Sequence, residues 1–214
     1  MRKIYSYFLS LMLTAFLCIP WTSNALADEL LVANGTTSNS YVPVYGNYAE
    51  QKQRCQVIYP ASELSAMNGK EITKMVFYLK TRPTKVWDSE YTILLSEVTA
   101  STFTSAAWNT ETTGTVVYTG TLDGKSGTME IEFTESYVYH GGNLLFELQD
   151  QSDNSYSNAS FYGVATPTGT YASVSGNSTV FSSISPTRRT FRPKVTFTYE
   201  TASSCPKPTN LTKG

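Results

Sequence analysis

The chain has 214 residues, and 16 Lys and Arg against 17 Asp and Glu give a net charge of -1. A protein with so little basic charge cannot neutralise many phosphates, which argues against nucleic acid as a partner. The apolar fraction is 41%, with 15 tyrosines and 10 phenylalanines, and this is enough nonpolar material for a core. We therefore expect one folded domain with short appendages.

Residues 1–27 have the pattern of a secretory signal peptide. Arg2 and Lys3 precede an apolar run over 4–19, and an Ala-Leu-Ala motif stands directly before Asp28. An uncleaved membrane anchor is the alternative, but the run is shorter than the ~20 residues that span a bilayer. We expect a secreted mature chain that begins at Asp28 and is not a transmembrane protein.

The mature chain has the hydrophobic pattern of β-strands with one buried face. Met129, Ile131 and Phe133 alternate with polar residues over 128–135, and the same period of two occurs in 74–80 and 194–200. Further strands are expected at 30–33, 54–59, 91–98, 115–122, 143–148, 159–164 and 179–182.

Helical signal is confined to 60–67, which opens with Pro60 and is followed by Asn68-Gly69. Many short strands separated by turn residues predict an all-β, antiparallel β-sandwich over 28–200, since two amphipathic sheets can each bury one face against the other. A jelly roll is the favoured form and an immunoglobulin-like sandwich is the alternative. Pro193 lacks a backbone donor, so the last strand should begin there or lie at an edge.

The composition changes at residue 201. Residues 201–214 are rich in Ser, Pro, Lys and Thr, which is typical of an extended linker. We expect a longer natural protein that continues into another domain, and a short free tail is the alternative.

Two cysteines, Cys55 and Cys205, follow the signal peptide. In an oxidising compartment they would form a disulfide, which in the chain-entropy model contributes roughly 5 kcal/mol for so long a loop. The alternative is that Cys205 pairs with a cysteine further along a longer chain.

Several short motifs carry a resemblance to a known group of proteins. They are NGT at 34–36, SYVPVYG at 40–46, IYPASEL at 58–64, VYTG at 117–120 and YHGGNLL at 139–145. Together they resemble the N-terminal β-sandwich module of secreted Bacteroidetes-type surface proteins, which is followed by fibronectin type III domains. The segment CPKPTNL at 205–211 is similar to the start of such a domain. The resemblance implies an adhesin-like protein of the bacterial cell surface, with a fibronectin type III domain as its neighbour and no catalytic motif.

Catalytic chemistry has little support in the residues. His140, the only imidazole, precedes Gly141-Gly142 and is expected in a turn rather than in a nucleophilic triad. Glu130 and Glu132 share a strand face and could form the acid pair of a glycosidase, but such alternating acids usually line the wet face of a sheet. We therefore predict that the protein is not an enzyme.

One segment is rich in oxygen ligands. Asp150, Asp153 and Asn154 follow an expected strand, and calcium prefers carboxylate and amide oxygens from such loops. Calcium is therefore the one candidate cofactor, and an ordinary polar turn is the alternative.

Aromatic residues in loops are the main candidates for ligand binding. Sugar rings stack on exposed Trp or Tyr faces while neighbouring polar groups bond the hydroxyls. The candidates are Trp87, Trp108, Tyr156, Tyr162 and Tyr171, each of which could instead be a core residue. The leading hypothesis is an adhesion module for a glycan or host glycoprotein, and a structural spacer without a ligand is the alternative.

Overall fold

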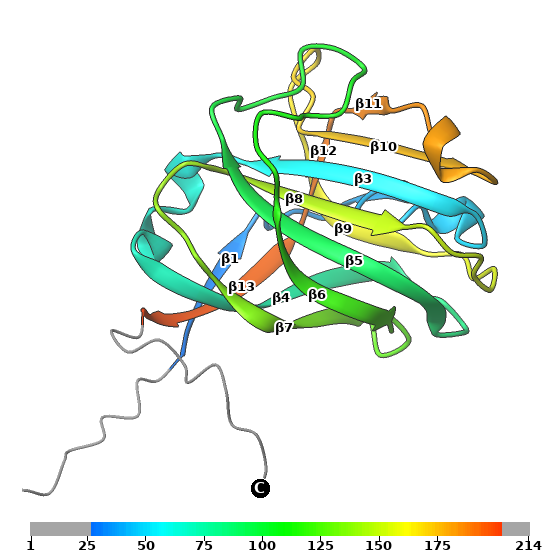
Figure 1. Ribbon diagram of the computed structural model, residues 1–214, viewed down its shortest axis with the longest axis horizontal. Coiled ribbons are helices and arrows are strands. Elements are labelled where there is room, and N and C mark those ends of the chain that lie inside the picture. Colours follow the sequence, from blue (N-terminus) through cyan, green and yellow to red (C-terminus); the bar gives the residue numbers. More distant parts are fainter. Residues whose placement is uncertain (1–26, 203–214) are drawn as a thin grey trace, which may run out of the picture.

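The computed structural model describes residues 27–202, which form a sandwich of two antiparallel sheets (Figure 1). The first sheet contains β1 (Asp28–Val32), β2 (Thr37–Asn39), β4 (Lys70–Thr81), β7 (Thr128–Val138), β9 (Ser160–Ala165), β12 (Phe191–Pro193) and β13 (Val195–Thr201). The second contains β3 (Lys52–Tyr59), β5 (Trp87–Val98), β6 (Thr115–Leu122), β8 (Asn143–Asp150), β10 (Ser173–Ser178) and β11 (Thr187–Arg189). This architecture confirms the all-β, antiparallel sandwich that the sequence predicts. Residues 1–26 of the expected signal peptide and residues 203–214 of the expected linker lie outside the described residues, while Thr201, the first residue of that linker, belongs to β13.

The strand order shows how the chain winds between the layers. The first sheet has the order β1-β13-β4-β9-β12, with β7 paired to β4 and β2 paired to β9, and the second has the order β11-β10-β3-β8-β5-β6. The chain crosses to the opposite sheet after each of β2 to β4, after each of β6 to β9, and after β11. Such repeated crossing is typical of a double-sheet jelly roll.

The main core lies between the two sheets and follows the period-two pattern of the sequence. On β4, Met75 and Phe77 point inward and are buried, while Val76 between them is partly exposed. The ring of Phe77 meets Phe146 of β8 with centroids 5.3 Å apart, and Tyr59 of β3 meets Phe197 of β13 at 5.5 Å. These edge-on aromatic pairs join the layers.

Two expected elements differ from the structure. The segment 179–182 is not a strand: the chain leaves β10 at Ser178 and turns into the 3-10 helix η5 (Phe181–Ser183). Valine and phenylalanine gave this turn the composition of a strand, whereas the real strand β10 is mostly small and polar. The expected helix at 60–67 is two separate 3-10 turns, η3 (Ala61–Glu63) and η4 (Ser65–Met67), and a third such turn is η2 (Gly46–Tyr48).

The sequence predicts that the last strand begins at Pro193 or lies at an edge, but the last strand, β13, lies between β1 and β4, and Pro193 belongs to the preceding strand β12, which ends the first sheet's order. Pro193 is the last residue of β12, and β13 starts two positions later at Val195. Side chains of the second sheet cover the strand: the Ser173 hydroxyl donates to the carbonyl of Phe191, and the Tyr59 hydroxyl donates to the carbonyl of Pro193. The sheet therefore ends in a strand whose polar groups are largely satisfied.

Both ends of the described chain leave from the same side of the sandwich. Asp28 at the start of β1 pairs with Tyr199 near the end of β13. The long β5–β6 connection at 99–114 and the strand β11 lie at the opposite side (Figure 1). Within residues 27–202, no helix has the length and apolar character needed to cross a bilayer.

Candidate functional site

The outer face of the second sheet is covered by the 99–114 connection, which is held by a small hydrophobic cluster of its own. Alternation on β3 sends Cys55 and Val57 into the main core, while Ile58 points the other way. The outer cluster consists of Ile58, Val98, Phe103, Leu145 and Val174, and Trp108 and Tyr171 pack against it. Phe103 therefore ties the connection down onto the sheet.

A charged network beside this cluster centres on the carboxylate of Glu147. Arg54 Nε donates to Glu147 Oε1 at 2.7 Å, and Gln149 Nε2 donates to the same oxygen at 2.6 Å. Gln56 Nε2 donates to Glu147 Oε2 at 2.6 Å. The carboxylate is buried, and its charge is balanced by Arg54 and by these amide donors.

The same network fixes the position of Trp108. The backbone N–H of Asn109 donates to Gln56 Oε1 at 2.7 Å, and Gln56 Nε2 donates back to the Asn109 carbonyl at 3.0 Å. The guanidinium of Arg54 lies 4.6 Å from the centre of the Trp108 ring. Trp108 is thus a partly exposed ring whose neighbours are ordered before any ligand arrives.

Glu111 closes the base of the connection. Its Oε2 accepts both the backbone N–H and the hydroxyl of Thr99 at 2.7 Å, and its Oε1 accepts the Asn109 side-chain amide at 2.9 Å. Hydrogen bonds from Thr99 hold the pKa of Glu111 below its usual range. These hydrogen bonds therefore hold the base of the 99–114 connection in place.

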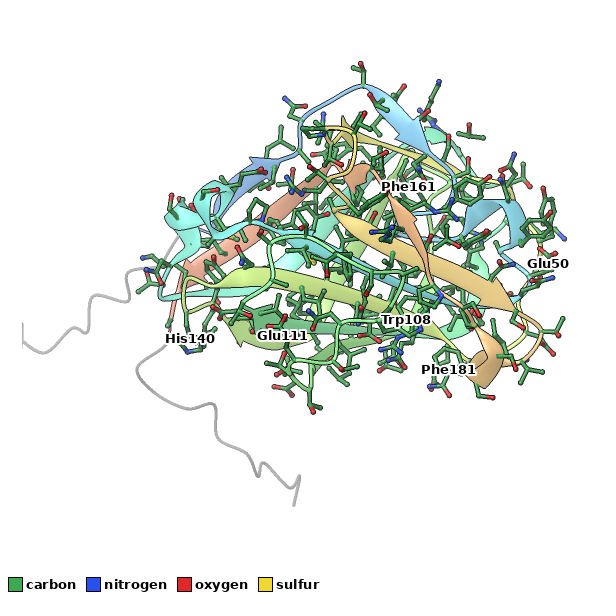
Figure 2. All side chains as sticks on the ribbon, turned by 90° about the horizontal axis from the view of Figure 1, so that it is seen from above. Glu50, Trp108, Glu111, His140, Phe161 and Phe181 are labelled. Carbon is green, nitrogen blue, oxygen red and sulfur yellow. The ribbon has the colours of Figure 1, made fainter. Side chains whose placement is uncertain are left out.

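Two grooves meet at Trp108. The first, of about 400 Å³, lies between Trp108, Arg54 and the side of η5 that carries Phe181. The second, of about 310 Å³, is lined by the connection itself, including Phe103 and Glu111. Figure 2 shows Trp108 between Glu111 and Phe181. Both volumes lie in the range of small-molecule sites, which run from roughly 300 to 1,000 Å³.

Of the other four predicted aromatic residues, one packs against the outer cluster and three lie elsewhere. Tyr171 packs against the same outer cluster as Trp108. Trp87 is 0% exposed, its indole N–H donates to the Ser157 carbonyl, and its ring stacks near Phe161, so it belongs to the main core. The other two candidates lie on the 151–159 segment and on β9: Tyr156 is 54% exposed, whereas Tyr162 is partly buried. Neither of them lines the two grooves at Trp108.

The three predicted calcium ligands face different partners. Asp150 is buried, accepts the hydroxyl of Ser89 at 2.9 Å, and has its pKa raised by burial. Asp153 is exposed and pairs with Lys52 at 2.7 Å, while the Asn154 side chain accepts a backbone N–H from Asp88. In the part of the chain from 27 to 202, no group of three or more His, Cys, Asp or Glu side chains is placed to hold a metal ion.

The candidate catalytic residues stand apart from the grooves. His140 lies in the β7–β8 turn, where its Nδ1 is 3.2 Å from Glu97 Oε1, and Figure 2 shows it far from Phe181. Glu130 and Glu132 are exposed on β7 beside Lys74, at 2.6 and 3.9 Å. The turn position of His140 and the wet sheet face of the two glutamates are as the sequence predicts.

Cys55 is buried in β3 and forms no disulfide with another residue between 27 and 202. Burial raises the pKa of this thiol far above its usual range, which makes it a poor nucleophile. Cys205, its expected disulfide partner, lies outside the described residues.

Comparison with known proteins adds no identification: no family model, curated protein or solved structure matches this chain. The resemblance to bacterial surface modules therefore rests on the sequence motifs alone and stays a prediction. The protein is an all-β sandwich. The 99–114 connection and two grooves lie on the outer face of its second sheet.

Sequence analysis missed most residues that hold Trp108. Arg54 and Glu147 lie on neighbouring strands but far apart in the sequence, and no motif links them. One usable signal was present: Val57-Ile58-Tyr59 is apolar at three successive positions, so one of these side chains must point outward. An outward Ile58 predicts that something covers the outer face of the sheet.

Proposed function

We propose that the protein is a secreted, non-enzymatic recognition module of a bacterial cell surface, whose ligand is a glycan or the glycan of a host glycoprotein. The proposed site is the Trp108 surface, which we define as Arg54, Trp108, Asn109 and Phe181. The observation that carries the proposal is the partly exposed Trp108 ring, held between two grooves by the Arg54–Glu147 network.

The chemistry of this surface suits a carbohydrate. The apolar C–H faces of a sugar ring stack on aromatic rings, and polar neighbours bind its hydroxyls. Trp108 and Phe181 supply aromatic surface, and the grooves add the polar side chains of Thr102, Thr104 and Ser185. Because the network holds its residues in place beforehand, binding loses little side-chain entropy.

A structural spacer with no ligand of its own is the second candidate. The burial of Trp87 agrees with it, since a spacer needs its large aromatic residues only in the core. Two observations favour recognition instead: Trp108 lines grooves, and the chain ends leave from the side of the sandwich opposite the 99–114 connection (Figure 1). A fibronectin type III neighbour attached beyond residue 202 would leave that face free.

A glycan and glycoprotein binding screen on the purified protein tests the proposal. We expect Trp108→Ala to weaken binding of the selected glycan by about tenfold or more, as for a central aromatic contact. Phe181→Ala, on the opposite wall of the groove, should weaken it less. Each variant is also checked for an unchanged thermal unfolding midpoint.

Tyr156→Ala is the matched control, because it removes an exposed aromatic ring that lines neither groove at Trp108. Its affinity for the glycan should equal that of the parent. The proposal fails if the parent binds no glycan or glycoprotein in the screen, or if folded Trp108→Ala and Phe181→Ala variants bind as well as the parent.

A further inference from the structure

A third groove, of about 400 Å³, lies beside β11 and is built around two adjacent arginines. We call it the arginine groove and define it by Arg188, Arg189, Tyr41 and Tyr171. Its other walls are neutral and consist of Thr37, Ser38, Asn39, Ala165, Thr190 and Phe191. It therefore combines two positive charges with hydroxyl and amide groups, and no aspartate or glutamate lines it.

Both guanidinium groups are held in place by a tyrosine ring and a hydrogen bond. Arg188 lies 4.1 Å from the centre of the Tyr171 ring, and its Nη1 donates to the Thr104 carbonyl at 2.7 Å. Arg189 lies 4.1 Å from the centre of the Tyr41 ring, and its Nε donates to the Ser175 hydroxyl at 3.3 Å. Stacking orders a guanidinium without neutralising it, so most N–H donors of both groups stay available.

These two arginines differ from Arg54 and Arg192 by their lack of a carboxylate partner. Arg54 pairs with Glu147 at 2.7 Å, and Arg192 pairs with Glu63 at 2.8 Å. Neither Arg188 nor Arg189 forms an ion pair with any residue between 27 and 202. No carboxylate in this part of the chain therefore neutralises their charges.

A third cation stands at the rim. Lys80 is exposed, and its Nζ lies 3.4 Å from the hydroxyl of Ser38, which lines the groove. The groove thus concentrates positive charge on a protein whose net charge is -1. Local charge of this kind attracts an anionic group despite the overall balance.

We propose that the arginine groove binds the carboxylate or sulfate group of an acidic sugar. The planar guanidinium groups match the oxygens of these anions and form paired, charge-assisted hydrogen bonds with them. The hydroxyl and amide side chains of the other walls suit the hydroxyls of a sugar better than an apolar lipid chain or peptide side chain. This site uses none of the residues of the Trp108 surface and extends beyond the function proposed for it.

Calorimetry with defined oligosaccharides tests the proposal. The carboxylate probe is an oligogalacturonate, its neutral control is the methyl ester of the same oligomer, and the sulfated probe is a heparin-derived oligosaccharide. We expect at least one acidic probe to bind, and the methyl ester to bind at least about tenfold more weakly than the oligogalacturonate if the carboxylate is the anion recognised. Binding should weaken as the salt concentration rises.

The variant Arg188→Gln/Arg189→Gln locates the binding site. Its control is Lys85→Gln/Lys125→Gln, which changes the net charge equally at exposed positions outside the groove. We expect the arginine variant to lose at least about tenfold in affinity for the acidic probe, and the lysine control and Trp108→Ala to lose much less.

Several results would overturn the proposal. They are no binding of either acidic oligosaccharide, an equal loss in the lysine control, and equally tight binding of polyglutamate. A loss of binding in Trp108→Ala with no loss in the arginine variant would overturn it as well, while supporting the Trp108 surface. The reverse result would support the arginine groove alone, so the two proposals can fail separately.

Discussion

The main core and the outer cluster are both hydrophobic, but they arise from the sequence in different ways. The main core lies between two sheets and is built by side chains at alternate strand positions, such as Met75 and Phe77. The outer cluster is built where the outward strand positions are apolar as well, at Ile58 and Leu145, and one connection covers it. The comparison indicates that the first holds the fold together, while the second holds the surface that carries Trp108. Mutations in the main core should therefore lower the stability of the fold, whereas mutations in the outer cluster should mainly change the geometry of the Trp108 surface.

The largest expected effect comes from the main core. Phe146 is fully buried between the sheets and contacts Phe77, so Phe146→Ala should lower the free energy of unfolding by about 3–5 kcal/mol. Denaturant unfolding measures the change. Val116→Ala, at an exposed position on β6, is the control and should change it by less than about 0.5 kcal/mol. A loss of less than about 1 kcal/mol in Phe146→Ala contradicts the assignment of stability to this core.

A smaller and more local effect is expected from the outer cluster. Phe103→Ala removes the side chain that ties the 99–114 connection to the sheet, and it should lower the free energy of unfolding by only about 1–2 kcal/mol, because the connection can open by itself. Amide hydrogen exchange should speed up over 99–114 and stay unchanged in β4. An even loss of protection across both sheets would show that the two clusters act as one unit.

The smallest expected effect is a change in pH dependence. Burial raises the pKa of Asp150, so the folded state holds this proton more readily than the unfolded chain does. The stabilisation from that proton is present at low pH and is lost as the pH rises through the raised pKa. The stability of Asp150→Asn relative to the parent should therefore increase as the pH rises from about 4 to 7.

Denaturant unfolding across this pH range measures the difference. Glu147→Gln is the matched variant on the outer face, where the carboxylate has Arg54 as its partner. It should be less stable than the parent at pH 7, because it leaves the arginine without its counter-charge. A difference between Asp150→Asn and the parent that does not vary with pH would rule out a raised pKa at this carboxyl.

The fold could be predicted from the sequence because period-two alternation is a local signal. Met129 and Ile131 indicate a strand and its inward face without reference to other strands. The segment 179–182 shows the limit of this signal, since residue preference alone cannot distinguish a β-rich turn from a strand.

The candidate site could be predicted only in part. Trp108 and Tyr171 were recognisable as aromatic residues in polar loops, and the structure brings both onto the outer cluster. The partners that order them are remote in the sequence: Arg54 lies over Trp108 and Arg188 over Tyr171. Such pairs depend on which strands become neighbours, and one sequence does not reveal that.

The largely satisfied backbone of the edge strand β12 affects how copies of the protein can associate. A strand from another molecule adds to a sheet by hydrogen bonding to free backbone groups at its edge. At β12, Pro193 has no N–H to offer, and hydroxyls of Ser173 and Tyr59 already occupy two of the carbonyls. This edge therefore cannot serve as a template for strand exchange or fibril growth, so crowded copies of the module would not polymerise through it.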